Sequence, residues 1–592
     1  ADYDRMREIK KELDELWKKE ETALWQRSRD RKILEGDRNN AYFHALANHR
    51  HRKNHLSELN SPNGVVTSTR EMLEVATSFY KELFAFEPKP DIHLDANFWS
   101  EDDMVSADER EYLERPFSEE EIKQAVMSSY ASGAPGPDGL SFLFYQNFSD
   151  LIKKDFMWMV RDFERGILDI YKLNHAIITL IPKIPMAKDM KNFRPISLSN
   201  CAVKIFSKAM TTRASPLCDR LISSYQTAFI KGRFILESVV MAHEVIHEVH
   251  RSGTAGLVLK LDYEKAYDRV SWDFLKEMLL SRGFGNKWVD WVISTIHQST
   301  FQVRINDSNG PQFSGGEGLK QDDPHSPLLF NLVADVFSKM LQKATSIGLI
   351  RGLLPQAFPG GVVSLQYADD TILFLENSLE YAKKLKWILS CFEHLSGLKI
   401  NFHKSDLHAI NISEQLSNEF AQVFCCQMGD FPFKYLGAPL HFKKLRREDL
   451  QPIIDRIIKN ISGWLGRFLS YRGKLILLTT CIASIPAYLM SIMKFPKWAI
   501  DMITSQMSHF FWGNMGDSHK YHLANWGLIS REKEFGGLGV PNLREFNMAL
   551  LASWGKRFYD GRNSEWKRML KYKYNTTCLI FLILGWFLVL HL

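Results

Sequence analysis

Apolar residues in the middle of the chain recur with two periods, one typical of buried strands and the other of amphipathic helices. Short runs of Ile, Val and Leu in AIITLIPKI (176–184) and GLVLKLDY (256–263) predict buried strands. The segment SWDFLKEMLLSRG (271–283) predicts a helix, because a serine N-cap precedes its apolar positions and a glycine follows them. Strand and helix patterns alternate from about residue 173 to residue 402, which predicts mixed α and β structure.

Two further strand patterns, VVSLQY (362–367) and TILFLE (371–376), are separated only by Ala-Asp-Asp. A connection this short predicts a β-hairpin. It carries two adjacent carboxylates, Asp369 and Asp370, which repel each other unless cations or hydrogen-bond donors compensate them. An exposed polar hairpin tip would tolerate such a pair, but the apolar residues on both sides favour a cation-binding role.

A third carboxylate, Asp262, lies at the end of another predicted strand and is far from the acidic pair in sequence. Only tertiary folding could therefore bring the three together. Mg²⁺ takes oxygen ligands from one or two carboxylates and completes its coordination with substrate phosphates. Three carboxylates at strand ends would form a two-metal site for in-line displacement at phosphorus, where one ion activates a hydroxyl and the other holds the triphosphate.

Beyond residue 440 the pattern becomes helical and basic. Apolar residues at three- and four-residue spacing form one stripe of a predicted amphipathic helix: Leu450, Ile453, Ile454, Ile457, Ile458, Ile461, Trp464 and Leu465. Basic residues occupy its polar side and its surroundings: Lys443, Lys444, Arg446, Arg447, Arg456, Lys459, Arg467 and Arg472. Cations distributed in this way suit contact with nucleic-acid phosphates.

Residues 1 to about 60 are predicted to be helical and end in a basic, histidine-rich stretch, HALANHRHRKNHL (44–56). Two interpretations are open for this stretch. It is either a solvated helical face or a surface that contacts phosphates through Arg50, Arg52 and Lys53.

The composition is that of a globular protein, with 45% hydrophobic and 24% charged residues. A net charge of +6 permits a nucleic-acid partner without requiring one. Seven cysteines without a CxxC pair give neither a disulfide framework nor a zinc-ribbon spacing, which favours a reducing intracellular compartment. The segment HEVIH (243–247) has the spacing of a zinc-peptidase helix, but no partner motif supports metal binding there.

The first residues form a charged helical pattern and not a signal peptide. Near the other end, CLIFLILGWFLVL (578–590) is continuously apolar. As a helix rising about 1.5 Å per residue, it would fall short of the roughly 30 Å hydrocarbon core of a membrane. A tail anchor and an unrelated extension of the reading frame are the interpretations left open, and a membrane partner is not expected.

Two of these motifs, YADD (367–370) and KLDYEKAYDRVSWDFL (260–275), resemble the reverse transcriptase of plant LINE-type non-LTR retrotransposons. The resemblance covers roughly residues 20 to 570 and continues in order through EGDRNNAYFHA (35–45), APGPDG (134–139), LIPKI (180–184), NFRPISLSN (192–200), GLKQDDPHSPLLFNLVAD (318–335), SGLKINFHKS (396–405), YLGAPL (435–440) and GGLGVPNL (536–543). Nothing in the sequence resembles the endonuclease or the RNase H of these elements, so a truncated copy is expected.

The resemblance implies an RNA-directed DNA polymerase that transfers dNTPs to a DNA primer on an RNA template. The implied cofactor is a pair of Mg²⁺ ions, with Mn²⁺ as an alternative, and the implied location is the nucleus or the cytoplasm. The implied fold is α+β, a right hand with a palm sheet, fingers and a helical thumb. The expected divisions are a helical N-terminal region (1–84), a linker (85–116), fingers (117–255), a palm (256–410, in a core of about 165–440), a thumb with further helices (411–570) and an apolar tail (571–592).

The resemblance also assigns catalytic roles to matching residues. Asp262, Asp369 and Asp370 would hold the two metal ions at the reacting phosphate. Lys404 would donate a proton to the leaving pyrophosphate, although an ordinary surface lysine is an equally good interpretation of this position.

Four further residues are implied to bind the incoming nucleotide. Arg194, with Lys183 nearby, would contact its triphosphate, where a guanidinium offers bidentate neutralisation. Tyr267 would close against the sugar and favour deoxynucleotides, with a core tyrosine as the alternative interpretation. Gln321 would lie near the templating base pair.

The chain departs from the family pattern at two positions of the QDDPHSP run. The family usually has glycine after the glutamine and leucine before the Ser-Pro pair, where this chain has Asp322 and His325. Glycine lets backbone approach a nucleotide closely, whereas Asp322 adds bulk and a negative charge near phosphates. Two functions are therefore open: an active polymerase, and a catalytically weakened remnant that still binds nucleic acid.

Overall fold

The computed structural model describes residues 55–574, except Asp91, Gln298, 464–468, 514–521 and Asn563, together with a few isolated positions before residue 55. The chain divides into two compact units, one of residues 55–436 and one that includes residues 437–592. The palm was predicted to end at residue 410, but the palm sheet includes a further strand, Gln427–Met428, which pairs with the strand Asp406–Ile410. The core domain was predicted to end at about residue 440, and the first unit ends at residue 436.

One five-stranded sheet carries the predicted acidic hairpin. Its strands, in order across the sheet, are β12 (Gln427–Met428), β11 (Asp406–Ile410), β5 (Gly256–Leu261), β10 (Asp370–Glu376) and β9 (Ser364–Tyr367). Strands β9 and β10 are antiparallel, and so are β10 and β5. Nearly every residue of β5 and β10 is buried, which is typical of strands covered on both faces. The predicted hairpin and the predicted strand at 256–263 are confirmed.

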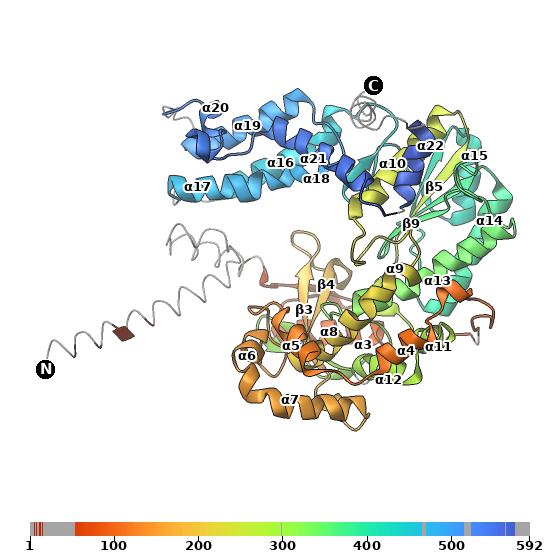
Figure 1. The fold of residues 1–592 in the computed structure, drawn as a ribbon, viewed down its shortest axis with the longest axis vertical. Coiled ribbons are helices and arrows are strands. Elements are labelled where there is room, and N and C mark those ends of the chain that lie inside the picture. Colours follow the sequence, from red (N-terminus) through yellow and green to blue (C-terminus); the bar gives the residue numbers. More distant parts are fainter. Residues whose placement is uncertain are drawn as a thin grey trace. The chain divides into compact units, whose positions relative to one another are not determined.

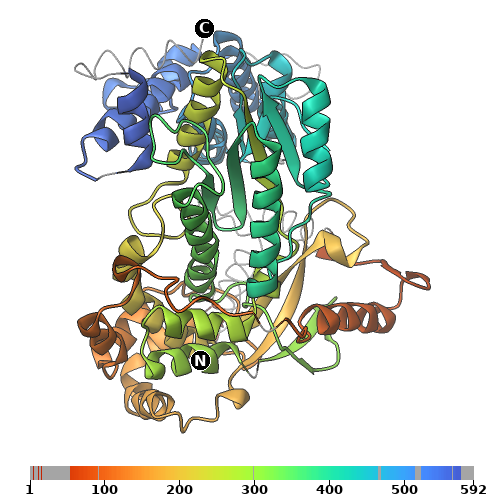
Figure 2. The ribbon, with the colours of Figure 1, turned by 90° about the vertical axis from the view of Figure 1, so that its right-hand side faces the viewer.

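Helices around this sheet complete the largest hydrophobic core. They are α10 (Ile235–Arg251), α11 (Trp272–Ser281), α13 (Ser326–Ser346), α14 (Leu379–Ser396) and α15 (Glu414–Phe424). Helix α10 packs on β9 and β11, and α14 packs on β10 and α13; the green helices α13 and α14 are seen lengthwise in Figure 2. Helix α11 confirms the predicted helix, since the Ser271 hydroxyl accepts a hydrogen bond from the Phe274 amide at 3.3 Å.

A second sheet lies in the same unit and contains the other predicted strand, 176–184. Its strands are β4 (Phe193–Ser199), β3 (His175–Pro182), β6 (Thr300–Ile305) and β7 (Ser308–Asn309), with β8 (Phe313–Ser314) also paired to β6. Strands β3 and β4 are antiparallel neighbours, whereas β3 and β6 are parallel. Helix α3 (Thr69–Leu83) packs on β6, and this layer forms a separate core. Figure 2 shows the orange β3 and β4 apart from the green strands of the palm sheet.

Two predictions about the N-terminal third are wrong in detail. Residues 1–84 were predicted to be helical, but β1 (Leu59–Ser61) and β2 (Gly64–Val66) form a hairpin before α3. Residues 85–116 were predicted to be a linker, but they contain a turn of 3-10 helix (Glu101–Asp103) and α4 (Ala107–Glu114). The apolar residues in this acidic segment are buried in the main core: Phe98, Trp99, Val105 and Leu113.

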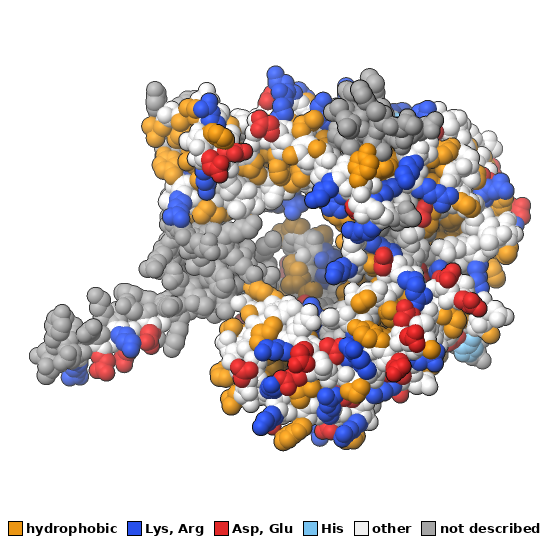
Figure 3. All heavy atoms as spheres, in the orientation of Figure 1, with side chains coloured by type: hydrophobic (Ala, Val, Ile, Leu, Met, Phe, Trp, Pro, Cys, Tyr) orange, Lys and Arg blue, Asp and Glu red, His pale blue; other side chains and the backbone are white. Residues whose placement is uncertain are grey.

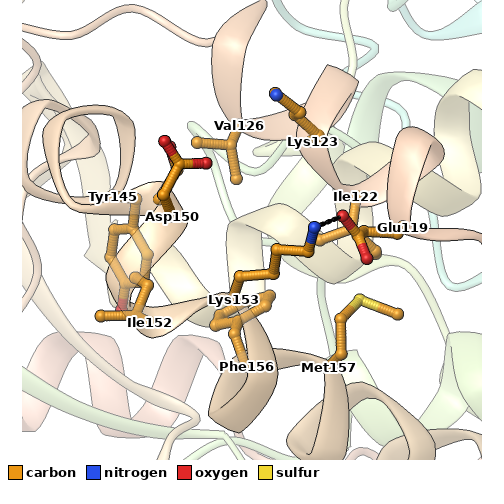
Figure 4. A pocket seen from close by; sticks show the side chains of 11 residues that line it. Glu119, Ile122, Lys123, Val126, Tyr145, Asp150, Ile152, Lys153, Phe156 and Met157 are labelled. Carbon is orange, nitrogen blue, oxygen red and sulfur yellow. Dashed lines mark ion pairs between the residues drawn. The ribbon is translucent and has the colours of Figure 1, made fainter.

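Short helices enclose the outer side of the main core. They are α5 (Glu119–Met127), α6 (Phe142–Asn147), α7 (Ser149–Glu164), α8 (Cys201–Ala214), α9 (Cys218–Leu221) and α12 (Asn286–Ile296). Figure 4 shows a pocket lined by residues of α5, α6 and α7, in which the Lys153 side chain extends to Glu119 and forms an ion pair. Its volume of about 60 Å³ admits a few water molecules but no nucleotide.

The described part of the second unit is largely helical (Figure 1). After β14 (Ala438–Leu440), it contains α16 (Arg447–Gly463), α17 (Tyr471–Leu477), α18 (Ser484–Met490), α19 (Lys497–Trp512), α20 (Trp526–Ile529), α21 (Leu543–Phe558) and α22 (Glu565–Tyr574). Four residues of the predicted apolar stripe are buried in α16: Leu450, Ile454, Ile457 and Ile461. Ile458 is exposed, and Trp464 and Leu465 lie outside the described residues.

Among the described residues, one helical run, Tyr471–Met490, is long and apolar enough to cross a membrane. Its mean hydropathy is 1.5, and 44% of it is buried. A core helix passes the same test, so these properties do not assign the run to a membrane. The predicted apolar tail at 578–590 lies outside the described residues.

Candidate active site

The strand register brings the three predicted carboxylates to one end of the palm sheet. Thr371 lies opposite Leu261, so Asp370 and Asp262, the residues next to this pair, are neighbours across β10 and β5. Asp369 occupies the two-residue turn between β9 and β10. All three side chains are open to solvent. The structure thus places together the carboxylates that the sequence predicted to act as one site.

The charge of Asp369 raises the pKa values of the other two carboxyl groups. Burial of the surrounding site raises the pKa of Asp370, and the charges of Asp369 and Asp262 raise it further. The pKa of Asp262 is also raised, first by desolvation and then by Asp369, against the opposing charges of Lys404 and Lys260. Clustered carboxylates with raised pKa values are expected at cation sites, because a bound cation offsets their mutual repulsion and their desolvation.

The donor set fits a hard divalent cation. Within the described residues, the side chains of Asp262, Asp369 and Asp370 accept no hydrogen bond from another residue and form no ion pair. Their oxygens are therefore unengaged, and oxygen is the ligand that Mg²⁺ prefers. As they stand, however, no three His, Cys, Asp or Glu side chains in the described chain are gathered closely enough to hold a metal ion. This also applies to HEVIH on α10, whose two imidazole rings are 6.4 Å apart.

Two predicted triphosphate contacts face the carboxylates from the second sheet. Lys183 follows β3, and Arg194 lies on β4 directly opposite Ile181 of β3. Both side chains are exposed. The pKa of Asp369 is raised by desolvation, and the charges of Arg194 and Lys183 act in the opposite direction. These cations are therefore within electrostatic reach of the acidic pair, as the predicted nucleotide site requires.

Tyr267 also lies beside the acidic pair. Its ring stacks on Phe330 with centroids 4.6 Å apart. Burial raises the pKa of its hydroxyl, and the negative charge of Asp369 raises it further. Tyr267 is thus both packed against the core and close to the carboxylates, so the two interpretations of this residue are compatible.

Gln321 is fixed by hydrogen bonds at both its backbone and its side chain. Its carbonyl accepts a hydrogen bond from the Ser197 amide of β4 at 2.9 Å. Its Nε2 donates to Oδ1 of Asp268 at 3.0 Å. The backbone of Gln321 is therefore attached to the second sheet and its side chain to Asp268.

Asp268 is a site residue that the sequence argument missed. It is 1% exposed, and burial raises its pKa to about 6, although Lys265 and the hydrogen bond from Gln321 lower it. Its Oδ2 has no hydrogen-bond partner. The available signal was an aspartate flanked closely by apolar residues in AYDRV, six residues after Asp262. A buried carboxyl group with a raised pKa is typical of functional sites.

Lys404 lies close enough to Asp262 to lower its pKa. Its side chain is exposed, and its backbone amide donates to the Asn401 carbonyl at 3.0 Å. The same loop holds Asp262 from the other side, since the Asp262 amide donates to the Ser405 hydroxyl at 3.1 Å. Its predicted role as a proton donor remains a prediction.

The predicted nucleic-acid contacts outside the palm are only partly described. Arg50 and Lys53 lie outside the described residues, and Arg52 is exposed. The basic residues on and before α16 are all exposed: Lys443, Lys444, Arg446, Arg447, Arg456 and Lys459. On the face seen in Figure 3, basic and acidic side chains of the described residues are intermixed. Phosphate binding by these residues stays a prediction.

The departure at Asp322 coincides with an unusual backbone conformation. Asp322 has a φ of 87°, in the left-handed region that favours glycine. Its carboxylate pairs with Lys204 at 2.7 Å, and the Lys204 side chain is only 8% exposed. The backbone thus keeps the geometry of a glycine position, although an aspartate occupies it.

The departure at His325 introduces a buried imidazole. The side chain is 1% exposed, neither ring nitrogen has a hydrogen-bond partner, and its ring meets Trp288 edge to face with centroids 6.3 Å apart. Burial lowers its pKa to about 3. A polar ring without partners destabilises a core.

Replacing His325 with Leu is expected to raise the free energy of unfolding by about 1–3 kcal/mol at pH 7, because two unsatisfied polar atoms leave the core. The unfolded imidazole takes up a proton below about pH 6.5, whereas the folded one does so only near pH 3. The wild-type chain should therefore lose about 2 kcal/mol more than the variant between pH 7 and pH 5. Chemical denaturation at both pH values measures this, with the exposed His394→Leu as control; equal pH dependence would contradict it.

The part of the chain that contains the carboxylates is similar to known proteins. Residues 181–440 match the family described as reverse transcriptase (RNA-dependent DNA polymerase). The uncharacterized 149 kDa protein of transposon TX1 from Xenopus laevis is 27% identical over 548 residues, which are 91% of this chain and 40% of that protein. The Pol polyprotein of the type-2 retrotransposable element R2DM from Drosophila melanogaster is 25% identical over 371 residues, which are 59% of this chain and 33% of that protein.

A solved apo telomerase from Candida tropicalis, truncated from its C-terminal domain, is 14% identical to this chain. The likeness covers 41% of this chain and 51% of that chain, with a TM-score of 0.30, which is too low to bear on the fold.

The family match extends from the end of β3 to β14 and includes all three carboxylates. Together with the mixed α and β architecture, it confirms the predicted class of right-hand polymerase fold. The matched residues 181–440, which are less than half of the chain, are similar to reverse transcriptases. The similar proteins include those of transposon TX1 and of R2 retrotransposable elements. The chain spans 40% and 33% of the two relatives described above, and plant origin and truncation remain predictions.

Proposed function

We propose that this chain is an RNA-directed DNA polymerase that adds dNTPs to the 3′-hydroxyl of a DNA primer on an RNA template. The observation that carries the proposal is the convergence of Asp262, Asp369 and Asp370 at one end of the palm sheet, within the residues that are similar to reverse transcriptases. A nucleus or cytoplasm that supplies template and nucleotides would be its location.

In the proposed reaction, the primer 3′-oxygen attacks the α-phosphorus of the dNTP, the bond to the β-phosphate oxygen breaks, and pyrophosphate leaves. Divalent ions such as Mg²⁺, when bound, lower the pKa of the attacking hydroxyl and neutralise the charge that develops on the leaving group. Asp262, Asp369 and Asp370 supply the oxygen ligands for these ions. Their raised pKa values favour cation binding, because a cation relieves their mutual repulsion.

The remaining residues would position the nucleotide. Lys183 and Arg194, whose charges act on Asp369, would pair with the triphosphate, where Arg offers two parallel donors. Tyr267, stacked on Phe330, would form the surface beneath the sugar. Lys404, near Asp262, would donate a proton to the departing pyrophosphate.

Asp322 favours a second candidate, a remnant that binds a primed template but extends it poorly. Its carboxylate lies two residues from Lys320 and one from Gln321, in the segment predicted to approach the nucleotide. A fixed negative charge there opposes the triphosphate, and its pairing with Lys204 removes a cation from the same region.

Primer extension separates these functions. The full chain, with Mg²⁺, a primed RNA template and radiolabelled dNTPs, is expected to give products whose length follows the template. Binding of the primed template without extension would favour the remnant. If neither the wild-type chain nor Asp322→Gly extended the primer, the proposal would be wrong.

A further inference from the structure

The turn that presents Asp369 and Asp370 is held by a residue far away in sequence. Gln226 lies in the loop between α9 and α10 and is completely buried. Its Oε1 accepts a hydrogen bond from the Ala368 amide at 2.9 Å and another from the Ala228 amide at 3.1 Å. Ala368 is the residue immediately before the acidic pair.

We propose that Gln226 is a positioning residue for catalysis: it fixes the turn so that Asp369 and Asp370 can bind divalent cations at the end of the palm sheet. This inference rests on the proposed polymerase function. Gln226 touches neither substrate nor the carboxylates, and it would act through the backbone of Ala368.

The turn requires such support because its backbone conformation is unfavourable. Ala368 has a φ of 53°, in the left-handed region that a residue with a Cβ rarely adopts. Strained backbone persists where surrounding contacts determine it. The hydrogen bond from the Ala368 amide to Gln226 is such a contact, and it lies on the buried side of the turn.

The loop that contains Gln226 pairs with β9, the outer strand of the hairpin, through backbone hydrogen bonds. The Gln366 amide donates to the Tyr225 carbonyl at 2.9 Å, and the Thr227 amide donates to the Gln366 carbonyl at 3.1 Å. Gln226 therefore pairs with β9 in parallel fashion. The backbone of this loop pairs with Gln366, and the Gln226 side chain bonds two residues further on, to the Ala368 amide, where backbone pairing has ended.

The loop is fixed on its other side by Arg233. One guanidinium nitrogen of Arg233 donates to the Gln226 carbonyl at 2.7 Å, and its Nε pairs with Asp219 at 3.1 Å. Helix α13 contributes as well, since Asn331 Nδ2 donates to the Ala228 carbonyl at 2.6 Å. Gln226 thus links a loop that is held on both sides to the turn through a hydrogen bond, in addition to its packing in the core.

Two substitutions separate positioning from packing. Gln226→Met keeps a similar side-chain volume but removes the acceptor, which leaves two buried amides without a partner. Gln226→Glu keeps an acceptor oxygen at the same place. If Gln226 positions the turn, kcat for primer extension should fall about tenfold in Gln226→Met. The Mg²⁺ concentration for half-maximal rate should rise about tenfold, and the Kd for the primed template should not change.

Gln226→Glu should regain most of the lost kcat, and Gln422→Met, an exposed glutamine on α15, should match the wild-type chain. Mn²⁺ binding followed by electron paramagnetic resonance gives a second readout that needs no turnover. Gln226→Met should bind Mn²⁺ about tenfold more weakly than wild type, whether or not the chain extends primers.

Wild-type kcat and Mn²⁺ affinity in Gln226→Met would overturn the inference. Equal losses in Gln226→Met and Gln226→Glu, accompanied by equal losses of thermal stability, would also overturn it, because they would indicate a purely structural role. Failure of the polymerase function is recognised separately: extension would be absent from the wild-type chain and Gln422→Met, while the difference in Mn²⁺ affinity would remain.

Discussion

Asp369→Asn is expected to slow primer extension at least about a thousandfold while the chain still binds its primed template. Asp369 is the carboxylate whose charge raises the pKa values of both Asp262 and Asp370. An amide at this position removes one anionic ligand, and electrostatic stabilisation by a bound metal is worth several kcal/mol in the transition state. A loss of about 4 kcal/mol corresponds to about three decades in rate.

The same substitution should also acidify its neighbours. Removing the charge of Asp369 takes away a cause that raises the pKa of Asp370, so this carboxyl group should lose its proton at lower pH in the variant. Single-turnover extension measures the rate, and filter binding measures the affinity for the primed template. Asp290→Asn, an exposed position on α12, is the matched control. Extension at the wild-type rate in Asp369→Asn would remove this residue from the catalytic set.

The parts of the site that lie within continuous strand patterns could be predicted from the sequence. The alternation around YADD gave the hairpin, and the apolar run before Asp262 gave the buried neighbour strand. Carboxylates between buried residues are costly unless they serve a purpose, so their chemistry was visible without coordinates. Lys183 and Arg194 were assigned through motif resemblance, and the pairing of β3 with β4 brings them to nearby positions.

Residues that contribute through a single long-range hydrogen bond could not be predicted. Gln226 and Ala368 are 142 residues apart, and nothing in a glutamine within a polar loop indicates that it will be completely buried. Asp268 was missed for the same reason, because its hydrogen-bond partner Gln321 is 53 residues away. The periodicity of apolar residues indicates which face of a helix or strand is buried, but it does not identify hydrogen-bond partners that are far apart in sequence.

The predicted linker at 85–116 failed for a related reason. Its acidic composition suggested solvent exposure, yet Phe98 and Trp99 are buried. The indole of Trp99 lies under the guanidinium of Arg282, 4.4 Å from the ring centroid, and Arg282 pairs with Asp335 at 2.9 Å. Most acidic residues of the segment are exposed, but Asp103 is buried and pairs with Lys339, and a few aromatic residues attach the segment to the core.

The two departures from the family pattern affect different properties of the chain. His325 is buried with no hydrogen-bond partner for either ring nitrogen, which destabilises the folded chain. Asp322 is half exposed, so its charge can reach a bound substrate. Replacing His325 should therefore change mainly the stability of the chain, and replacing Asp322 mainly its activity.

Asp322→Gly is expected to raise the rate of primer extension by about thirtyfold. If a substrate phosphate comes within about 8 Å of the carboxylate, their repulsion at an effective dielectric of 20 is about 2 kcal/mol per unit charge, which corresponds to about thirtyfold in rate. The substitution also frees Lys204, whose ammonium is now neutralised at 2.7 Å. Glycine accepts the φ of 87° without strain, so the loop should keep its conformation.

Two further variants separate charge from backbone strain. Asp322→Asn and Asp322→Ala both remove the charge, so both should recover most of the rate. The Asp322→Ala variant should be less stable than Asp322→Gly by about 1 kcal/mol, because alanine, unlike glycine, places a Cβ in the left-handed region. Steady-state extension and thermal unfolding of the three variants provide these values. The double variant Asp322→Gly, Asp369→Asn should stay about a thousandfold slower than Asp322→Gly alone. A rate in Asp322→Asn equal to that of the wild-type chain would mean that the charge at this position does not limit the reaction.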